Sequence, residues 1–180
     1  KKHCTSSTKT LCNKLKKVYA SYKWQGDPCK NIKWRVYGET KNKNPLIYTK
    51  IGSGSNTTLI LGGVHADELT PMHLAFKFAQ RLSQQKTDIH KLKNISFIIA
   101  PLVSPDGLFK NKPLRTNGLV DPNRNFLTRD WYKKYPKKNT LKTRRYFPGF
   151  FPKTEKETIF QEYLVKKYKV KKIITIHAPL

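Results

Sequence analysis

The 180-residue sequence has no long apolar segment. A membrane-spanning helix needs about 18 or more consecutive apolar residues. No such run occurs, so we expect no membrane span. The sequence also lacks an initiator methionine, the apolar region of a secretory signal peptide, internal repeats and low-complexity segments. Its length suits one domain with a substantial core and is short for two.

Acidic residues are scarce. The 11 Asp and Glu residues are outnumbered by 37 Lys and Arg residues, which gives a formal net charge of +26. A field of this sign attracts nucleic acid, anionic lipid or anionic cell-wall polymer without selecting among them. An ordinary solvated, lysine-rich surface explains the same charge equally well. No nucleic-acid-binding motif accompanies it, so nucleic acid ranks lowest among these partners.

Cysteine is rare as well. The three cysteines, Cys4, Cys12 and Cys29, all lie in the first 29 residues, and no Cys-x-x-Cys pair occurs. This clustering favours a cross-linked N-terminal segment over a metal site. A Cys12–Cys29 disulfide, with Cys4 left over, would indicate an oxidising compartment outside the cytoplasm. Three free thiols would instead indicate the reducing cytoplasm, and the sequence is compatible with both.

Apolar periodicity predicts a strand–helix–strand unit in the middle of the chain. Residues 57–64 are predicted as a buried strand, and the Thr70-Pro71 pair then begins an amphipathic helix that runs to Gln84. Residues 95–100 are a second apolar run and the next buried strand. Two strands joined by a helix pair in parallel, so the predicted fold class is α/β, with a mostly parallel mixed sheet and flanking helices.

The flanking regions complete the expected domain organisation. Residues 1–40 are predicted as a lead-in segment that contains one helix near residues 11–22, and residues 41–180 as the main domain. Within that domain we expect four further segments. They are a strand at 45–51, a long irregular segment at 101–152, a helix opened by a capping box at 154–157, and a buried strand at 173–176.

Three metal-ligand side chains follow the predicted buried strands. His65 and Glu68 come just after the strand at 57–64, and His177 comes just after the strand at 173–176. Open α/β sheets place their ligand sites at the carboxyl ends of the strands. Two histidines and one carboxylate are a ligand set of catalytic zinc, which keeps a further position for water. The His-x-x-Glu spacing alone is weak, because it recurs by chance in many proteins.

The irregular segment between these ligands contains residues suited to binding a carboxylate. Asn123 and Arg124 lie side by side after a proline, where the guanidinium offers a bidentate fork and the amide a directed donor. Arg115 is placed to face a carbonyl oxygen as it gains negative charge. Taken singly, each arginine is better explained as ordinary surface charge in a basic protein.

Together these motifs resemble the zinc carboxypeptidase family, the M14 or carboxypeptidase A type. The resemblance covers residues 58–180 in order and is closest to bacterial murein peptide amidases, hydrolases that cut the γ-D-Glu–meso-diaminopimelate bond of peptidoglycan. The matching segments are Gly63-Val64-His65-Ala66-Asp67-Glu68, Ser104-Pro105-Asp106-Gly107, Arg115, Asp121-Pro122-Asn123-Arg124-Asn125-Phe126 and Thr175-Ile176-His177.

The resemblance implies a role for each matched site residue. His65, Glu68 and His177 would bind one zinc ion, and Arg115 would stabilise the oxyanion that forms during peptide hydrolysis. Asn123 and Arg124 would hold the free carboxylate of a cell-wall peptide or of another peptide. Asp67 receives no role. A metalloprotease of the cell wall would act in the periplasm or elsewhere outside the cytoplasm, and a cytoplasmic location is the alternative.

The resemblance also implies residues that this sequence does not contain. Members of the family carry a general-base Glu, and usually a substrate-side Tyr, well after the third zinc ligand, whereas the sequence stops three residues after His177. We therefore expect the N-terminal part of a longer amidase. A complete chain of this length would have negligible peptidase activity, because a general base contributes roughly 10²–10⁴-fold.

Two alternatives to the amidase interpretation stay open. One is a catalytically inactive module that binds anionic cell-wall polymer through its basic surface. The other is an aspartoacylase-like deacylase, which shares the His-x-x-Glu and Asn-Arg elements; the Ser104–Gly107 segment and its spacing to Arg115 favour the peptidase over it.

Overall fold

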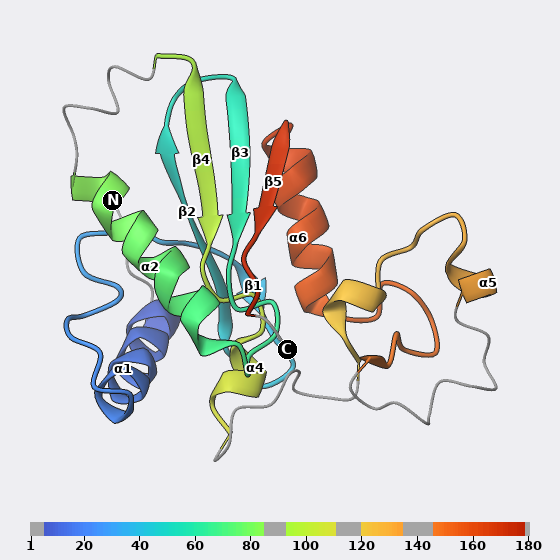
Figure 1. The fold of residues 1–180 in the computed structure, drawn as a ribbon, viewed down its shortest axis with the longest axis horizontal. Coiled ribbons are helices and arrows are strands. Elements are labelled where there is room, and N and C mark those ends of the chain that lie inside the picture. Colours follow the sequence, from blue (N-terminus) through green and yellow to red (C-terminus); the bar gives the residue numbers. More distant parts are fainter. Residues whose placement is uncertain (1–5, 85–92, 111–119, 135–145, 179–180) are drawn as a thin grey trace.

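The computed structural model describes residues 6–84, 93–110, 120–134 and 146–178. They form a five-stranded sheet with helices on both faces (Figure 1). The strands are β1 (Arg35–Glu39), β2 (Pro45–Gly52), β3 (Asn56–Leu61), β4 (Ile95–Ala100) and β5 (Lys172–Thr175). The helices are α1 (Ser6–Ser21), α2 (Leu69–Gln84), α4 (Pro105–Leu108), the 3₁₀ helix η1 (Pro122–Arg124), α5 (Trp131–Lys134) and α6 (Lys156–Lys167).

The sheet is mixed, as the sequence predicts. Its strand order is β1-β2-β4-β3-β5. Strand β3 pairs in parallel with both β4 and β5, whereas β2 runs antiparallel to its neighbours β4 and β1. Four strands therefore share one direction. The β3–α2–β4 segment is the predicted parallel unit, and the α/β fold class is confirmed.

The core lies on both faces of the sheet because the buried strands alternate their side chains. Leu59 and Leu61 of β3 face α6, where they join a cluster with Phe160 and Leu164. Ile60 faces the other way, into the cluster formed with α1 and α2. Strands that are covered on both faces have unbroken apolar runs in the sequence, which explains why β3 and β4 could be predicted from their apolar residues.

The N-terminal segment packs directly on this core. Helix α1 buries Leu11, Leu15 and Tyr19, in agreement with the predicted lead-in helix. Strand β1 was not predicted, since its side chains are mostly half-buried and show no clear alternation. Because β1 pairs with β2, part of the expected 1–40 lead-in segment belongs to the sheet. The domain boundary at residue 40 stays a prediction.

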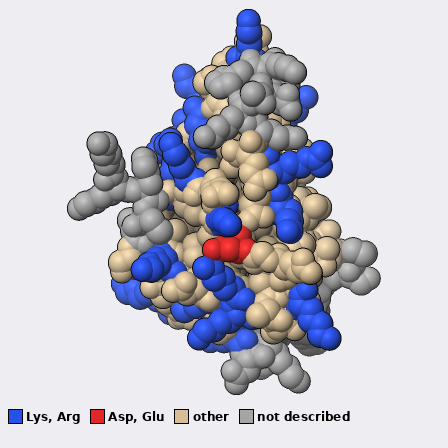
Figure 2. Space-filling view, turned by 90° about the vertical axis from the view of Figure 1, so that its left-hand side faces the viewer, with Lys and Arg blue, Asp and Glu red and all other residues tan. Residues whose placement is uncertain are grey.

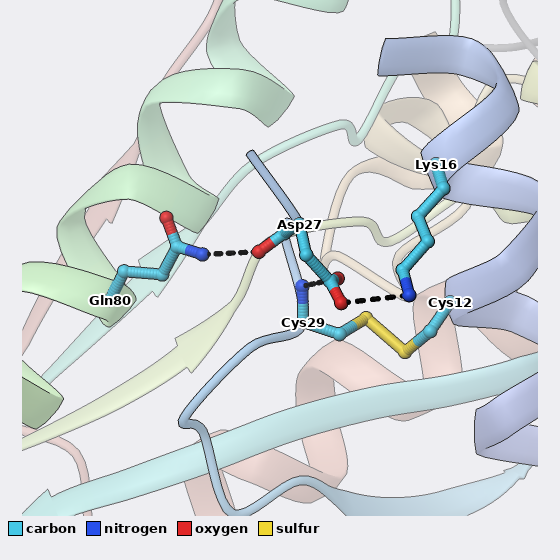
Figure 3. Close-up of a disulfide and its surroundings, with 5 residues drawn as sticks. All are labelled: Cys12, Lys16, Asp27, Cys29 and Gln80. Carbon is cyan, nitrogen blue, oxygen red and sulfur yellow. Dashed lines mark hydrogen bonds and ion pairs between the residues drawn. A yellow bond between two sulfur atoms is a disulfide. The ribbon is translucent and has the colours of Figure 1, made fainter. Parts of the chain in front are cut away.

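A disulfide between Cys12 and Cys29 fastens α1 to the loop that follows it (Figure 3). In that loop, Asp27 accepts a hydrogen bond from the backbone N–H of Cys29 and forms an ion pair with Lys16 of α1, with 2.9 Å between Nζ and Oδ2. The side chain of Gln80 donates to the backbone oxygen of Asp27, so the same loop also holds α2. The structure thus contains the cross-link considered from the sequence, while Cys4 lies outside the described residues.

Two local predictions about the C-terminal region are wrong. The predicted capping box does not form, because Glu155 is the N-cap of α6 and makes no side-chain cap hydrogen bond. Thr154 instead contacts the amide of Asn125, whose Oδ1 accepts from the backbone N–H of Glu155. The predicted burial of β5 is also wrong: all four of its residues are exposed, because it lies at an edge of the sheet.

Basic side chains spread over the surface. On the face that carries α1 and α2, lysines and arginines surround a small acidic area (Figure 2). Among the described residues, no helix is long and apolar enough to cross a membrane.

The carboxyl group of Glu157 is partly shielded from solvent. Glu157, at the start of α6, lines a cavity of about 850 Å³ together with the 40–43 loop and Phe147. Burial raises the pKa of Glu157 from 4.5 to about 7, and the negative charges of Asp106 and Glu155 contribute to this increase.

Replacement of the Cys12–Cys29 cross-link by serines should lower the free energy of unfolding by about 3 kcal/mol, because an open loop regains chain entropy when unfolded. Urea denaturation of the Cys12→Ser/Cys29→Ser variant and the wild type measures the difference. A reducing agent should bring the wild type to the level of the variant and leave the variant unchanged. Equal stability of the oxidised wild type and the variant would contradict this prediction.

The stability of the fold should decrease as the pH rises from about 4.5 to about 7. In this interval the folded protein keeps a proton on Glu157 that the unfolded chain has released. Glu157→Gln should therefore unfold like the wild type near pH 4.5 and be more stable above pH 7, by on the order of 1–3 kcal/mol. Urea melts across this pH range test the prediction. Glu162 lies on the same helix and forms an ion pair with Lys153, so Glu162→Gln should show no such gain.

Candidate metal centre

Two glycines set the turn that carries the first two candidate ligands. After β3 ends at Leu61, the backbone of Gly62 still pairs with the strand β4, through its N–H to the oxygen of Ala100. A Cβ on Gly62 would lie 2.7 Å from the Cβ of Ala75 in α2, so only glycine fits there. Gly63 has a φ of +54°, which also favours glycine. The chain can therefore turn sharply and present His65 at the end of the sheet.

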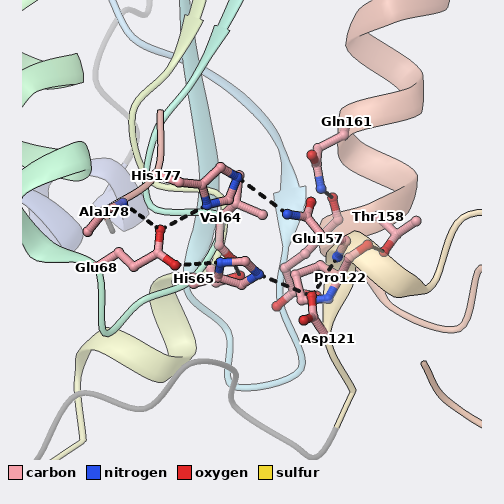
Figure 4. A network of polar contacts seen from close by, with 12 residues as sticks. Val64, His65, Glu68, Asp121, Pro122, Glu157, Thr158, Gln161, His177 and Ala178 are labelled. Carbon is pink, nitrogen blue, oxygen red and sulfur yellow. Dashed lines mark hydrogen bonds and ion pairs between the residues drawn. The ribbon is translucent and has the colours of Figure 1, made fainter. Parts of the chain in front are cut away.

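The three predicted ligands meet at the carboxyl end of the parallel strands (Figure 4). The carboxylate of Glu68 lies between two imidazoles, with its Oε1 2.8 Å from Nδ1 of His65 and its Oε2 2.9 Å from Nδ1 of His177. One potential ligand atom from each of the three residues lies within 4.8 Å of the others. Backbone contacts close this arrangement, because Glu68 N–H donates to the oxygen of His65 and Ile176 N–H donates to that of Leu61.

The protonation of this cluster is suited to a cation. Burial would raise the pKa of Glu68, but its hydrogen bonds with His177 and His65 outweigh burial and hold the pKa below its ordinary value. The carboxylate is therefore charged at neutral pH, and each Nδ1 that faces it needs a proton or a metal ion between the two atoms. Two imidazole nitrogens and one carboxylate fit zinc in both number and donor type.

Asp121 contacts the ring nitrogen of His65 that does not face Glu68. The sequence analysis did not assign this role to Asp121. Its side chain is fully buried, and its Oδ1 lies 3.1 Å from Nε2 of His65. The same oxygen accepts from the backbone N–H of Asn123 and caps η1. A carboxylate on Nε2 fixes the ring and leaves Nδ1 to act as a ligand. The signal available in the sequence was an acid placed just before the Pro122-Asn123 pair.

The predicted substrate-binding residues lie beside the cluster. The side-chain nitrogen of Asn123 is 3.4 Å from Nε2 of His177. The guanidinium of Arg124 lies over the ring of Tyr146, 5.6 Å from its centroid. Thr158 of α6 donates to the oxygen of Pro122 and so anchors η1. Arg115, predicted to stabilise an oxyanion, lies outside the described residues.

Other residues of the quoted motifs hold the loops around the centre. Ser104 donates through Oγ to the oxygen of Val64, the residue before His65, over 2.7 Å. Asp106 is buried and accepts hydrogen bonds from Thr40, from the backbone of Asn42 and from the side chain of Asn44. The Ser-Pro-Asp-Gly segment is thus a structural clamp on the loops that border the centre.

Comparison with known proteins identifies the family and the fold. The family model of zinc carboxypeptidases matches residues 28–179. No curated protein matches the chain in sequence. Among solved structures, bovine thrombin-activatable fibrinolysis inhibitor in complex with tick carboxypeptidase inhibitor superposes with a TM-score of 0.69 at 21% identity, over 92% of this chain and 60% of that one.

Two further structures have the same fold. Carboxypeptidase A from Helicoverpa armigera gives a TM-score of 0.67 at 17% identity, over 92% of this chain and 44% of that chain. Murein-tripeptide amidase MpaA from Escherichia coli O157 gives a TM-score of 0.59 at 24% identity, over 82% of this chain and 62% of that chain. The chain thus spans about half of the length of these proteins. By its family match over most of its residues, the chain belongs to the zinc carboxypeptidase family.

Proposed function

We propose that the protein is a zinc-dependent metallocarboxypeptidase of the murein peptide amidase type. It would hydrolyse a peptide bond next to a free carboxylate in cell-wall peptides, at the γ-D-Glu–meso-diaminopimelate linkage. The observation that carries the proposal is the position of Glu68 between the Nδ1 atoms of His65 and His177 at the end of the sheet. Membership of a zinc-dependent family supports the choice of metal.

In this proposal, His65, Glu68 and His177 hold one zinc ion. When bound, zinc polarises the carbonyl group of the substrate and acidifies water. Asp121 is the positioning residue of the centre: it accepts from Nε2 of His65 and keeps Nδ1 free of a proton for the metal. The two buried ligands, His65 and Glu68, are held by the same backbone turn, so their relative position is fixed before a metal binds.

The substrate carboxylate is assigned to Asn123 and Arg124. Both lie on η1, which Asp121 caps and α6 anchors, so their backbone is rigid. The side chain of Asn123 reaches His177, which supports a carboxylate site next to the proposed metal ligands. A guanidinium and an amide together recognise a planar carboxylate with directed hydrogen bonds. Arg115 keeps its proposed role at the developing oxyanion.

Three observations support cell-wall peptide as the substrate class. A murein-tripeptide amidase is among the structures with this fold. The Cys12–Cys29 disulfide is typical of proteins outside the cytoplasm, where cell-wall peptides are found. The net charge of +26 attracts the protein to anionic polymers of the wall. We therefore propose a periplasmic or other extracytoplasmic location.

We expect the chain to bind one zinc ion and a peptide that ends in meso-diaminopimelate. Elemental analysis after dialysis gives the zinc content, and calorimetry gives the affinity for the tripeptide. Amidation of the carboxylates of that terminal residue should weaken binding by about tenfold or more, because the half-buried Asn123 and Arg124 lose their charged partner. Arg124→Gln should weaken tripeptide binding similarly, whereas Arg129→Gln, at an exposed position of the same loop, should not. The proposal would be refuted if the dialysed protein contained no zinc, or if the amidated tripeptide bound as tightly as the unmodified one.

Asp121→Asn should weaken zinc binding by about 10–100-fold, because His65 loses the carboxylate that orients it and raises its basicity. Competition with a chromophoric chelator measures the affinity. Asp130→Asn removes the same charge from an exposed site and should leave zinc affinity unchanged. Equal effects of the two substitutions would show that net charge, rather than support of His65, is responsible.

A further inference from the structure

Aromatic and basic side chains are concentrated in one segment of the chain, residues 126–153. The segment contains eight of the protein's 21 aromatic residues and nine of its 37 Lys and Arg residues. Asp130 is its single acidic residue. None of these side chains belongs to the candidate metal centre, so the composition of the segment needs a separate explanation.

The described parts of this segment, residues 126–134 and 146–153, project together from the body of the fold beside α6 (Figure 1). They are called the aromatic projection below. Both parts are held at their base by the buried Asn125. Its backbone oxygen accepts from the N–H of Lys153, and its Nδ2 donates to the oxygen of Pro148 over 2.9 Å. The projection is therefore anchored where it leaves the fold.

The aromatic projection exposes several of its rings. Tyr132, Phe150 and Phe151 are 61%, 57% and 56% exposed, and no other aromatic side chain among the described residues is more than half exposed. Leu127, which is 54% exposed, adds an aliphatic side chain to the same projection. Single exposed apolar side chains are ordinary, but a group of them in one place marks an interaction site.

Two of the exposed rings are each supported by a buried ring. Trp131 donates through Nε1 to the backbone oxygen of Arg124 over 2.7 Å and packs edge to face with Tyr132, with 5.1 Å between the ring centroids. The buried Phe147 packs in the same way with Phe150, at 5.2 Å. Aromatic pairs of this geometry stabilise one another beyond their burial. The fold thus holds the exposed rings in place, so a partner that covers them orders little that was free before.

Cations accompany the exposed rings, and their kind indicates the partner. Arg129, Lys133 and Lys134 are all exposed on the projection. A protein partner is disfavoured, because lysine is depleted from protein–protein interfaces. A soluble anionic polymer would pair with the cations but leave the apolar side chains in water. A bilayer with anionic lipid satisfies both, since its headgroups attract Lys and Arg and its interface takes up aromatic and aliphatic side chains.

We propose that the aromatic projection docks the protein on the surface of a bilayer that contains anionic phospholipid. The three exposed rings enter the boundary between headgroups and acyl chains, and the exposed cations contact the headgroups. The docking is peripheral and requires no bound zinc, so it does not rest on the proposed function. Because Trp131 is bonded to Arg124, docking also brings the proposed carboxylate site close to the bilayer. That consequence alone rests on the proposed function.

Sedimentation with lipid vesicles tests the docking, in the presence of a chelator. The chain should bind vesicles of phosphatidylglycerol mixed with phosphatidylcholine about tenfold or more tightly than vesicles of phosphatidylcholine alone, because anionic headgroups attract the cations. Salt at about 1 M should weaken the binding to the mixed vesicles without abolishing it, because salt screens the cations but not the contribution of the rings.

Two matched double variants test the rings. Phe150→Ser/Phe151→Ser should weaken binding to the mixed vesicles by about tenfold or more, because burial of a phenylalanine contributes at least this factor. Tyr22→Ser/Leu74→Ser changes exposed apolar side chains near α1 and on α2, across the sheet from α6, and should leave binding unchanged. Phe150→Trp should keep the binding, and brominated lipid should quench its fluorescence more strongly than that of the wild type.

A second matched pair tests the cations. Lys133→Gln/Lys134→Gln should weaken binding to the mixed vesicles by about tenfold, because each lysine near an anionic surface contributes to the attraction. Lys9→Gln/Lys17→Gln removes the same charge from exposed positions on α1 and should have little effect. The difference between the two variants separates docking through the projection from general attraction of a basic protein.

Several outcomes would overturn the docking surface. They are the absence of vesicle binding, equal binding by the wild type and Phe150→Ser/Phe151→Ser, and equal losses in the two lysine variants. A single-stranded oligonucleotide that binds more tightly than the vesicles and depends on Phe150 and Phe151 would assign the surface to nucleic acid instead. Concentration-dependent dimers that the same serine variant abolishes would assign it to a second copy. A chain that docks on vesicles but retains no zinc would contradict the proposed function alone.

Discussion

The register of β3 against its two parallel neighbours determines where every part of the site lies. Leu61 is paired with Ala100 on one side and with Thr175 on the other, so three chain segments end at the same level. His65 and Glu68 follow the central strand and His177 follows β5. Because alternate residues of a strand face opposite sides, a slip of one residue in β5 would turn the isoleucines to the wrong faces and move His177 away from Glu68.

Three of the 11 acids of this basic chain are buried at places where they join separate loops. Among the described residues, the three buried carboxyl groups are those of Glu68, Asp106 and Asp121. Each accepts hydrogen bonds from residues distant in the sequence, so each joins loops that the sheet does not connect. Negative charge at the candidate centre is therefore provided by buried, immobile groups.

Much of this fold follows from local sequence patterns. The strands β3 and β4 are continuous apolar runs, and the ligands follow them as polar residues of a distinctive kind, so both were predicted. The disulfide, by contrast, was one of two options left open. The predictions that failed depended on contacts between segments distant in the sequence, which local patterns do not show. The isoleucines of β5 predicted burial, but whether a strand is central or at an edge depends on the pairing of distant segments.

The dependence on distant contacts also explains why β1, the capping at Glu155 and the role of Asp121 were not predicted correctly. β1 was missed because a partly exposed strand has no clear alternation. The capping box was wrong because Asn125, about thirty residues earlier, takes the backbone N–H of Glu155. Asp121 was quoted as part of a motif without a role, since its contact with His65 spans 56 residues. In the cases of Glu155 and Asp121, hydrogen bonds to residues distant in the sequence decide the role of the residue.

The order in which these contacts can form differs greatly along the chain. The cross-link joins Cys12 to Cys29, only 17 residues apart, and needs nothing beyond the first segment. Glu68 and His177 are 109 residues apart, so their contact cannot form before the chain has grown as far as residue 177. Short loops close at a lower entropic cost and therefore earlier. A chain interrupted between these two points would thus carry the cross-link yet lack His177, one of the three candidate ligands.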